Sequence, residues 1–376
     1  MNKPNEEKDG AAQQALGASE EAPDGASEAP LEAASSETSP EADAASEALI
    51  EDFLAATGGE VVREAADVDI TDWHEAPLPE THKSGFIALV GRPNVGKSTL
   101  VNALVGQKVA IVSPKPQTTR SRLTGILTEP DYQLIFIDTP GFHQRPPHRL
   151  NEFMIEEAVA AIPDADVVLF VVDVSVPPRD EDRALAQLLQ ERAAAQPIIF
   201  VLNKMDRLSL EEAEARIHAY WSLLPNYADS MPTSALRGTN LDELVDTLLT
   251  FVPEGPRYYP GDQITNQTEH QIASELIREA LFRYTREEIP HSVAVLVEDY
   301  HERENGVFYV SARIWVERES QKPIIIGRGG RRLKQIGIAA RQELERFIGG
   351  QVYLDLWVKV QPKWRDHTGR LRELGY

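Results

Sequence analysis

The sequence predicts two folded domains behind an acidic tail: a doubly wound α/β domain over residues 82–254 and a smaller α+β domain over 255–376. Between residues 86 and 202, apolar runs of strand length alternate with helix-length amphipathic segments, as in a mostly parallel sheet covered on both faces. After the proline- and glycine-rich stretch 253–261, the order changes to a helix followed by two strands. This change indicates a second, separate unit.

The tail, residues 1–81, is predicted to be a disordered acidic extension. Residues 1–80 hold 21 acidic and 3 basic residues, so their net charge is −18, against −6 for 81–255 and +2 for 256–376. Ala, Glu, Ser, Pro and Gly dominate, and such a segment cannot bury enough apolar surface to offset its chain entropy. The net charge of −22 for the whole chain therefore does not exclude an RNA partner, because phosphate affinity depends on the local field.

Composition also excludes several classes of protein. The absence of cysteine excludes a disulfide scaffold, a thiolate nucleophile and a Cys-ligated metal. The longest apolar runs, 166–174 and 197–202, are far shorter than the roughly 20 residues that span a bilayer. We expect a soluble, monomeric, cytoplasmic protein, for which peripheral contact with the cytoplasmic face of the cell membrane stays open.

Strands of the first domain are predicted where apolar, β-branched residues run together, at 86–90, 132–137, 167–172 and 198–202. Helices are predicted at 99–105 and 183–194. In the second domain, a capping box at 268–271 precedes an apolar helical face that extends to residue 284. Strands at 292–297 and 307–316 flank the turn signal Asn305-Gly306. A glycine-rich break, two helices and a last strand at 352–360 complete the unit.

A phosphate-binding motif follows the first strand directly and precedes a helix. It fits the pattern G-x-x-x-x-G-K-[ST] with Gly91, Arg92, Pro93, Asn94, Val95, Gly96, Lys97 and Ser98. Glycines let backbone N–H groups approach phosphates, Lys97 would reach the β and γ phosphates, and Ser98 would ligate Mg²⁺. The sequence therefore predicts a nucleotide site at this turn, supported by the positive end of the following helix.

The base of the nucleotide is predicted by a second motif that ends the strand at 198–202, made of Asn203, Lys204, Met205 and Asp206. The Asp206 carboxylate can accept both the N1 and N2 protons of guanine and would repel adenine, with Asn203 as a supporting hydrogen-bonding group. Lys204 would pack its aliphatic stem on the base. Ser234 and Ala235 would bring a backbone N–H to the guanine oxygen.

Sensing of the γ phosphate is expected from two further segments. Asp138, Thr139, Pro140 and Gly141 follow the strand at 132–137, where Asp138 would hold Mg²⁺ through a water and Gly141 would offer its N–H. Upstream, a threonine of the loop at 113–121 would complete the Mg²⁺ shell in the triphosphate state. The sequence does not decide between Thr118 and Thr119.

A single-stranded RNA site is predicted in the second domain. Two close glycines let an RNA backbone approach a loop, and the surrounding arginines and lysines neutralise phosphates. The residues that we expect to contact RNA are Ile326, Gly327, Arg328, Gly329, Gly330, Arg331 and Lys334. An apolar groove including residues 324–326 and Ile336 would cover the bases. This loop and the element order resemble type II KH domains.

Taken together, these motifs resemble the translation-factor-like GTPases, and the spelling of residues 113–120 joined to a KH-type unit resembles the bacterial Era family. The resemblance covers about residues 84–376. It implies a P-loop GTPase domain and a cytoplasmic switch that binds GTP, GDP and Mg²⁺. It further implies binding to the 3′ end of 16S ribosomal RNA and a role in 30S subunit assembly and rRNA processing.

Two residues carry mechanistic expectations that follow from the resemblance. Phe142 occupies the place where Ras-like enzymes carry a water-orienting glutamine, so intrinsic hydrolysis should not exceed about 10⁻⁴ to 10⁻³ per second. Asn94 matches an asparagine that seats K⁺ in potassium-using relatives, or it only stabilises the loop. Two rival interpretations stay open: a nucleotide-gated RNA-binding module whose hydrolysis matters little, and a GTPase at the membrane surface.

Overall fold

The computed structural model describes residues 78–375, apart from residues 114, 116–117, 143–148 and 194. Residues 1–77, which hold nearly all of the acidic extension, lie outside the described residues, so the disorder expected there stays a prediction. Parts of the expected nucleotide-sensing loops at 113–121 and 138–150 lie outside them as well. Within the described part of the chain, no helix has the length and hydropathy needed to cross a bilayer.

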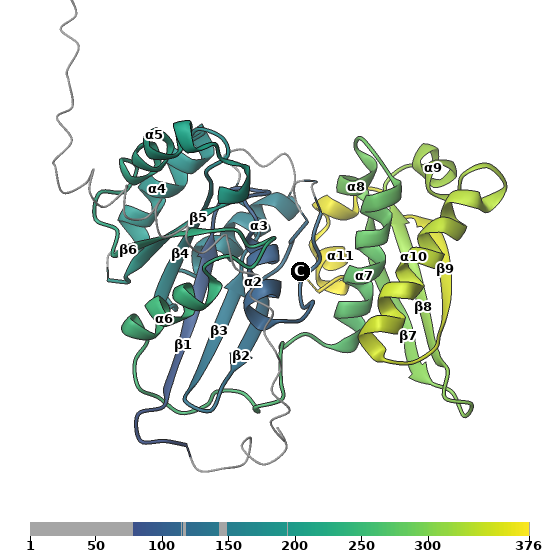
Figure 1. Ribbon diagram of the computed structural model, residues 1–376. Helices are drawn as coiled ribbons and strands as arrows, with labels where there is room; N and C mark the ends of the chain where they lie inside the picture. Colours follow the sequence, from purple (N-terminus) through teal and green to yellow (C-terminus); the bar gives the residue numbers. More distant parts are fainter. Residues whose placement is uncertain (1–77, 114, 116–117, 143–148, 194, 376) are drawn as a thin grey trace, which may run out of the picture. The chain divides into compact units, whose positions relative to one another are not determined.

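The first domain is built on a six-stranded sheet with the order β2-β3-β1-β4-β5-β6 (Figure 1). All neighbouring strands are parallel except β2, which pairs antiparallel with β3. The strands are β1 (Lys83–Val90), β2 (Leu123–Thr128), β3 (Tyr132–Asp138), β4 (Val167–Asp173), β5 (Ile198–Asn203) and β6 (Asp229–Thr233). The four predicted strands are thus confirmed as β1, β3, β4 and β5.

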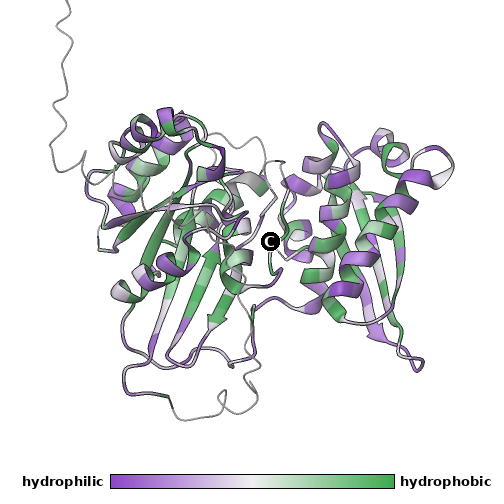
Figure 2. Cartoon of the chain, in the orientation of Figure 1, coloured by the Kyte–Doolittle hydropathy of each residue, from purple (hydrophilic) through white to green (hydrophobic). Residues whose placement is uncertain are grey.

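Helices cover both faces of this sheet, which confirms the doubly wound fold. They are α2 (Lys97–Val105), α3 (Arg149–Ala160), α4 (Asp180–Arg192), α5 (Leu210–Trp221) and α6 (Leu241–Phe251). One apolar cluster joins α2 and α6 to the face that carries Leu89, and another joins α4 and α5 to the face that carries Phe170. In Figure 2 the central strands are hydrophobic, whereas the helices carry both hydrophobic and hydrophilic residues. This burial on both faces is why the strands read as continuous apolar runs.

The second domain has a three-stranded sheet with the order β7-β8-β9, in which β7 and β8 are antiparallel and β8 and β9 are parallel. Its elements are α7 (Glu269–Tyr284), α8 (Ile289–Ser292), β7 (Ala294–Glu302), β8 (Phe308–Val316), α9 (Lys322–Ile326), α10 (Arg331–Ile348), β9 (Val352–Val360) and α11 (Thr368–Glu373). Helices α7 and α10 pack on one face of the sheet.

The predicted capping box is confirmed at the start of α7. The Thr268 hydroxyl accepts from the N–H of Gln271, and the Gln271 side chain accepts from the N–H of Thr268. The expected position of the two later helices was wrong, because they lie on either side of the glycine-rich break rather than both after it. A single amphipathic helix, α10, fills the whole interval between the break and β9.

Candidate functional site

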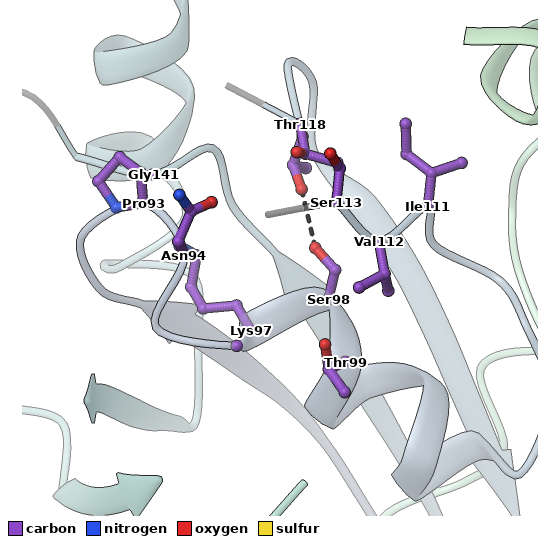
Figure 3. Close-up of a pocket in the computed structure, with 12 residues that line it drawn as sticks. Pro93, Asn94, Lys97, Ser98, Thr99, Ile111, Val112, Ser113, Thr118 and Gly141 are labelled. Atoms are coloured by element: carbon purple, nitrogen blue, oxygen red, sulfur yellow. Dashed lines mark hydrogen bonds between the residues drawn. The ribbon is translucent and has the colours of Figure 1, made fainter. Parts of the chain in front are cut away.

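The phosphate-binding motif forms the turn between β1 and α2 (Figure 3). Gly96 lies just before α2 with φ +110°, a conformation that side chains rarely adopt, and a Cβ there would collide with the Asn203 amide. Pro93 and Asn94 line the same pocket. Val95 is fully buried beneath the loop, and its carbonyl accepts a hydrogen bond from Asn203 Nδ2 at 2.8 Å.

Lys97 is the first residue of α2 and only 6% exposed. Its Nζ donates to the Gly91 carbonyl at 3.0 Å and lies 3.4 Å from the Arg92 carbonyl. Burial lowers the pKa of Lys97 to about 8, although the charge of Asp138 acts in the opposite direction. A bound phosphate would therefore stabilise the charged form of Lys97, because its oxygens would replace the water that burial removes from around the ammonium.

Nucleotide affinity should depend on pH through Lys97. A bound polyphosphate raises the pKa of this ammonium above its free value of about 8, so binding favours the protonated form. Affinity should be flat below about pH 8 and fall by up to about tenfold per pH unit above it. Titration with a fluorescent GDP analogue between about pH 7 and 9 tests this.

The matched variant for this titration is Lys97→Arg, whose guanidinium stays charged throughout the range. Its affinity, though weaker, should not vary with pH. A flat profile for the unchanged protein would contradict the expected linkage.

Three oxygen-bearing side chains meet beside Lys97. Ser98 Oγ donates to Asp138 Oδ2 at 2.6 Å and lies 2.9 Å from Thr119 Oγ1, which itself lies 3.2 Å from Asp138 Oδ2. In Figure 3 the Ser98 side chain points across the pocket toward the segment that carries Ser113 and Thr118. Thr118 Oγ1 instead donates to the Lys115 carbonyl at 2.7 Å. Of the two threonines, Thr119 is therefore the one that contacts Ser98 and Asp138.

The chemistry of this cluster fits a magnesium ion. Burial raises the pKa of Asp138, against the influence of Lys97 and the two hydroxyls, and its Oδ1 has no hydrogen-bond partner among the described residues. A divalent cation would stabilise the ionised carboxylate and use its free oxygen. Hydroxyl and carboxylate oxygens are also the ligands that Mg²⁺ prefers.

The second motif lies at the carboxyl end of β5 and lines a cavity of about 380 Å³ with Asp206, Lys204 and Ala235 in its wall. Asp206 Oδ1 accepts a hydrogen bond from Ser234 Oγ at 2.6 Å, which fixes the carboxylate. Met205 is buried below it. Asn203 Oδ1 accepts from the Ala235 N–H at 3.0 Å, so the expected donation from Ala235 to a guanine oxygen competes with this bond.

An ion-pair network that the motifs did not reveal ties the two loops together. Lys204 Nζ bridges the Asn94 carbonyl at 2.6 Å and Asp173 Oδ2 at 2.7 Å. Arg92 lies 3.1 Å from Asp182 and 3.6 Å from Asp173. Burial acts to raise the pKa of Asp173, but hydrogen bonds from Lys204 and Ser175 outweigh it and lower the pKa. The network holds the base-binding loop against the phosphate loop.

The segment after β3 packs against the phosphate loop. A Cβ at Gly141 would lie 2.7 Å from Pro93 Cα, so only glycine permits this approach. Thr139 Oγ1 donates to the Leu89 carbonyl at 2.6 Å. Pro140 and Phe142 line a small apolar cavity beside α4, and Phe142 packs on the same apolar cluster as that helix. The Phe142 ring therefore belongs to a hydrophobic contact.

Basic side chains anchor the segment that carries Thr119, and sequence reasoning missed their role. Arg120 is only 2% exposed, and its guanidinium donates to the carbonyls of Val293 at 2.8 Å and Pro290 at 3.1 Å. Lys115 donates to the carbonyls of Phe282 and Thr285. The residue next to Thr119 is thus hydrogen-bonded to α8 and to the chain that enters β7.

The glycine loop in the second domain joins α9 to α10. Gly327, Gly329 and Gly330 have φ values of +73°, +59° and +76°, which explains the requirement for glycine. Arg328, Arg331 and Lys334 surround the loop, with side chains that are exposed or partly exposed. A groove of about 410 Å³ runs from Gly330 between α10 and β9, with Lys334 and Arg341 on its α10 side.

The apolar wall of this groove differs from the expectation. Ile325 and Ile336 are fully buried in the core and cannot cover bases, and Ile326 is partly buried. The face of α10 that carries Leu333, Gly337 and Ile338 forms the wall instead, together with Leu354 and Leu356 of β9. The signal was available in spacing, because 333, 337 and 341 lie four residues apart on one helical face.

A phosphate loop, a guanine-type loop and a glycine-loop groove define the class of this protein as a P-loop GTPase joined to a KH domain. Residues 86–204 match the family model described as 50S ribosome-binding GTPase, and residues 288–365 match the KH domain model. GTPase Era of Heliobacterium modesticaldum is 47% identical over 79% of this chain and 98% of its own length. The chain belongs to the Era family of GTPases.

Further members of the Era family match this chain over nearly their whole length. GTPase Era of Carboxydothermus hydrogenoformans is 48% identical over 79% of this chain and 98% of its own length. The crystal structure of a single-residue variant of Aquifex aeolicus Era bound to GDP and aluminium fluoride is 42% identical, with a TM-score of 0.74 over 78% of this chain and 99% of that one. A structure of Era with MgGDPNP and nucleotides 1506–1542 of 16S ribosomal RNA is 41% identical, with a TM-score of 0.75 over the same shares.

Proposed function

We propose that this protein is a cytoplasmic GTP-driven switch that binds the 3′ end of 16S ribosomal RNA and assists 30S subunit assembly and rRNA processing. One observation carries the proposal: a single chain holds a partly buried hydroxyl and carboxylate cluster at a phosphate loop and a basic, glycine-looped groove. An Era structure that contains both MgGDPNP and 16S rRNA matches this chain along 99% of its own length. Nothing among the described residues favours the membrane-surface alternative.

The site geometry supports a specific division of labour. The loop from Gly91 to Ser98 would wrap the phosphates, with Lys97 between the β and γ groups and its charge balanced by Asp138. Ser98, Thr119 and Asp138 would hold Mg²⁺, which when bound neutralises phosphate charge. The contacts of Thr119 with Ser98 and Asp138 support this role for Thr119 rather than for Thr118. Gly141 would donate to the γ phosphate, and Asp206 would read guanine.

Phe142→Ala should change GTP turnover little, by less than about threefold, since the ring packs in an apolar cluster and cannot orient water. The variant should lose stability instead, by about 1–2 kcal/mol for truncating a partly buried ring. Single-turnover hydrolysis and thermal unfolding measure the two effects. A loss of turnover of several hundredfold would show that Phe142 acts on the reaction.

Two alternative roles are open for Asn94, binding of K⁺ or stabilisation of the phosphate loop. This residue adopts φ +64° at the pocket wall, and its carbonyl accepts from Lys204, which equally supports a purely loop-stabilising role. Hydrolysis rates in K⁺ and Na⁺ at equal ionic strength separate the two, because equal rates would leave only the loop role.

The proposal is tested by titrating the GTP-bound and GDP-bound protein with a short RNA that copies the 3′ end of 16S rRNA, while hydrolysis is followed. Tighter RNA binding with GTP and faster hydrolysis on RNA are expected for a coupled switch. RNA binding that ignores the nucleotide, without stimulation, would favour an RNA-binding module whose hydrolysis matters little.

A further inference from the structure

The outer face of the second sheet carries two large, exposed aromatic side chains. Side chains alternate along a strand, so Val352, Leu354 and Leu356 of β9 face α10 while Tyr353 and Trp357 face the other way. Tyr353 is 55% exposed and Trp357 64% exposed. The two positions lie roughly 13 Å apart along the strand.

Neighbouring side chains organise these aromatics into a stacking layer. Tyr353 and Tyr309 of β8 are stacked, with ring centroids 5.9 Å apart and planes 19° from parallel. The Arg303 guanidinium lies over both rings, 4.5 Å from the centroid of Tyr309 and 5.0 Å from that of Tyr353. Such contacts fix flat π surfaces before any ligand arrives.

Two basic side chains of this face are not paired with its carboxylates. Glu298 pairs with Arg313 at 2.7 Å and Asp299 contacts His301 at 2.8 Å, whereas Asp355 keeps its negative charge and accepts a hydrogen bond from Trp357 Nε1 at 3.0 Å. Among the described residues, neither Arg303 nor Lys359 has a carboxylate within ion-pair distance. A flat aromatic layer beside two such cations suits stacked bases with a phosphate backbone, as in single-stranded RNA.

The same face is continuous with the RNA groove. Tyr353 also lines the groove between α10 and β9, and β9 is an edge strand of its sheet. A strand of RNA that leaves the groove over this edge therefore meets Tyr353 first, and Trp357 lies farther along the same strand.

We propose that the face formed by Arg303, Tyr309, Tyr353, Trp357 and Lys359, here called the outer aromatic face, binds further nucleotides of the same single-stranded RNA. This inference rests on the proposed RNA-binding function and extends it beyond the four nucleotides that a glycine loop clamps. The outer aromatic face stacks bases and supplies affinity without a strict sequence requirement.

The test uses the full chain and two RNAs that copy the 16S 3′ end, one of about four nucleotides and one of about ten. The double variant Tyr309→Leu, Trp357→Leu keeps apolar side chains on β8 and β9 but removes two π surfaces that do not line the groove. It should bind the long RNA about tenfold or more weakly and the short RNA unchanged. The conservative pair Tyr309→Phe, Trp357→Phe should restore the long-RNA affinity.

Other results overturn the inference in distinguishable ways. Equal losses for both RNAs would mean that the aromatics support the groove, and no loss for either would mean that they do not touch RNA. Unchanged RNA affinity together with weaker binding to intact 30S particles would assign the face to a protein instead. If the unchanged chain binds neither RNA, the proposed function fails, and the inference fails with it.

Discussion

Replacing Asp206 with Asn should move the base preference of the nucleotide site from guanine to xanthine. The carboxylate presents two acceptor oxygens to the two N–H donors of guanine, whereas an amide would face one of them with its own N–H₂ group. Xanthine carries an oxygen at position 2, so it matches the amide. A site that pairs the polar groups of one base and leaves a buried polar group unpaired with another can discriminate between them by about 10⁴ or more. We therefore expect the ratio of GTP affinity to XTP affinity to change by a factor of about this size.

The structure explains why the variant should still fold. Asp206 Oδ1 accepts from Ser234 Oγ at 2.6 Å, and an asparagine oxygen can accept the same bond. The nearest cation, Arg237, lies 4.0 Å away with an exposed side chain, so no buried ion pair is broken. Loss of affinity for GTP would therefore report base recognition.

Fluorescent GTP and XTP analogues measure the ratio directly. Asp246→Asn, on the exposed side of α6, makes the same chemical change away from the cavity and should leave both affinities unchanged. If the Asp206 variant still prefers GTP by more than about tenfold, another group reads the base, since a mismatched buried amide cannot give that preference.

Sequence reasoning was strongest where chemistry requires contiguous residues. The phosphate loop needs glycine, lysine and serine at fixed spacing, and β1 and α2 lie on either side of it as the pattern predicts. Strand β2 was not predicted from the sequence, because Gly125 interrupts its apolar pattern. The glycine makes sense only in three dimensions, since a Cβ there would lie 2.6 Å from a methyl group of Val101 in α2.

Residues that join distant parts of the chain could not be predicted in the same way. Arg120 is hydrogen-bonded to carbonyls about 170 positions later, and Arg92 is paired with an aspartate 90 positions away. No sequence motif fixes the number of residues between either arginine and its partner, so these contacts could not be predicted from spacing. The predicted apolar lining of the groove was wrong for a different reason. Ile336 and Ile338 are equally apolar in the sequence, and only the packing shows that Ile336 faces the core while Ile338 faces outward.

The double substitution Arg328→Asp, Gly329→Asp should abolish measurable RNA binding while nucleotide affinity stays unchanged. It turns an exposed, positively charged loop negative at the place where an RNA backbone must approach closely. We expect RNA affinity to fall by on the order of a hundredfold or more. The nucleotide site shares no residue with this loop, so binding of a fluorescent GTP analogue should not change.

A matched control exists at the other end of the same helix. Gly349 ends α10 with φ +74°, close to the values of the loop glycines, and both Gly329 and Gly349 have open space where a Cβ would lie. Arg346→Asp, Gly349→Asp therefore introduces the same charges and comparable backbone strain away from the groove. Fluorescence anisotropy with a short 16S 3′ RNA should show tight binding for this control. Similar losses in the two variants would trace the effect to helix stability or net charge, whereas a loss confined to the loop variant assigns RNA recognition to Arg328 and Gly329.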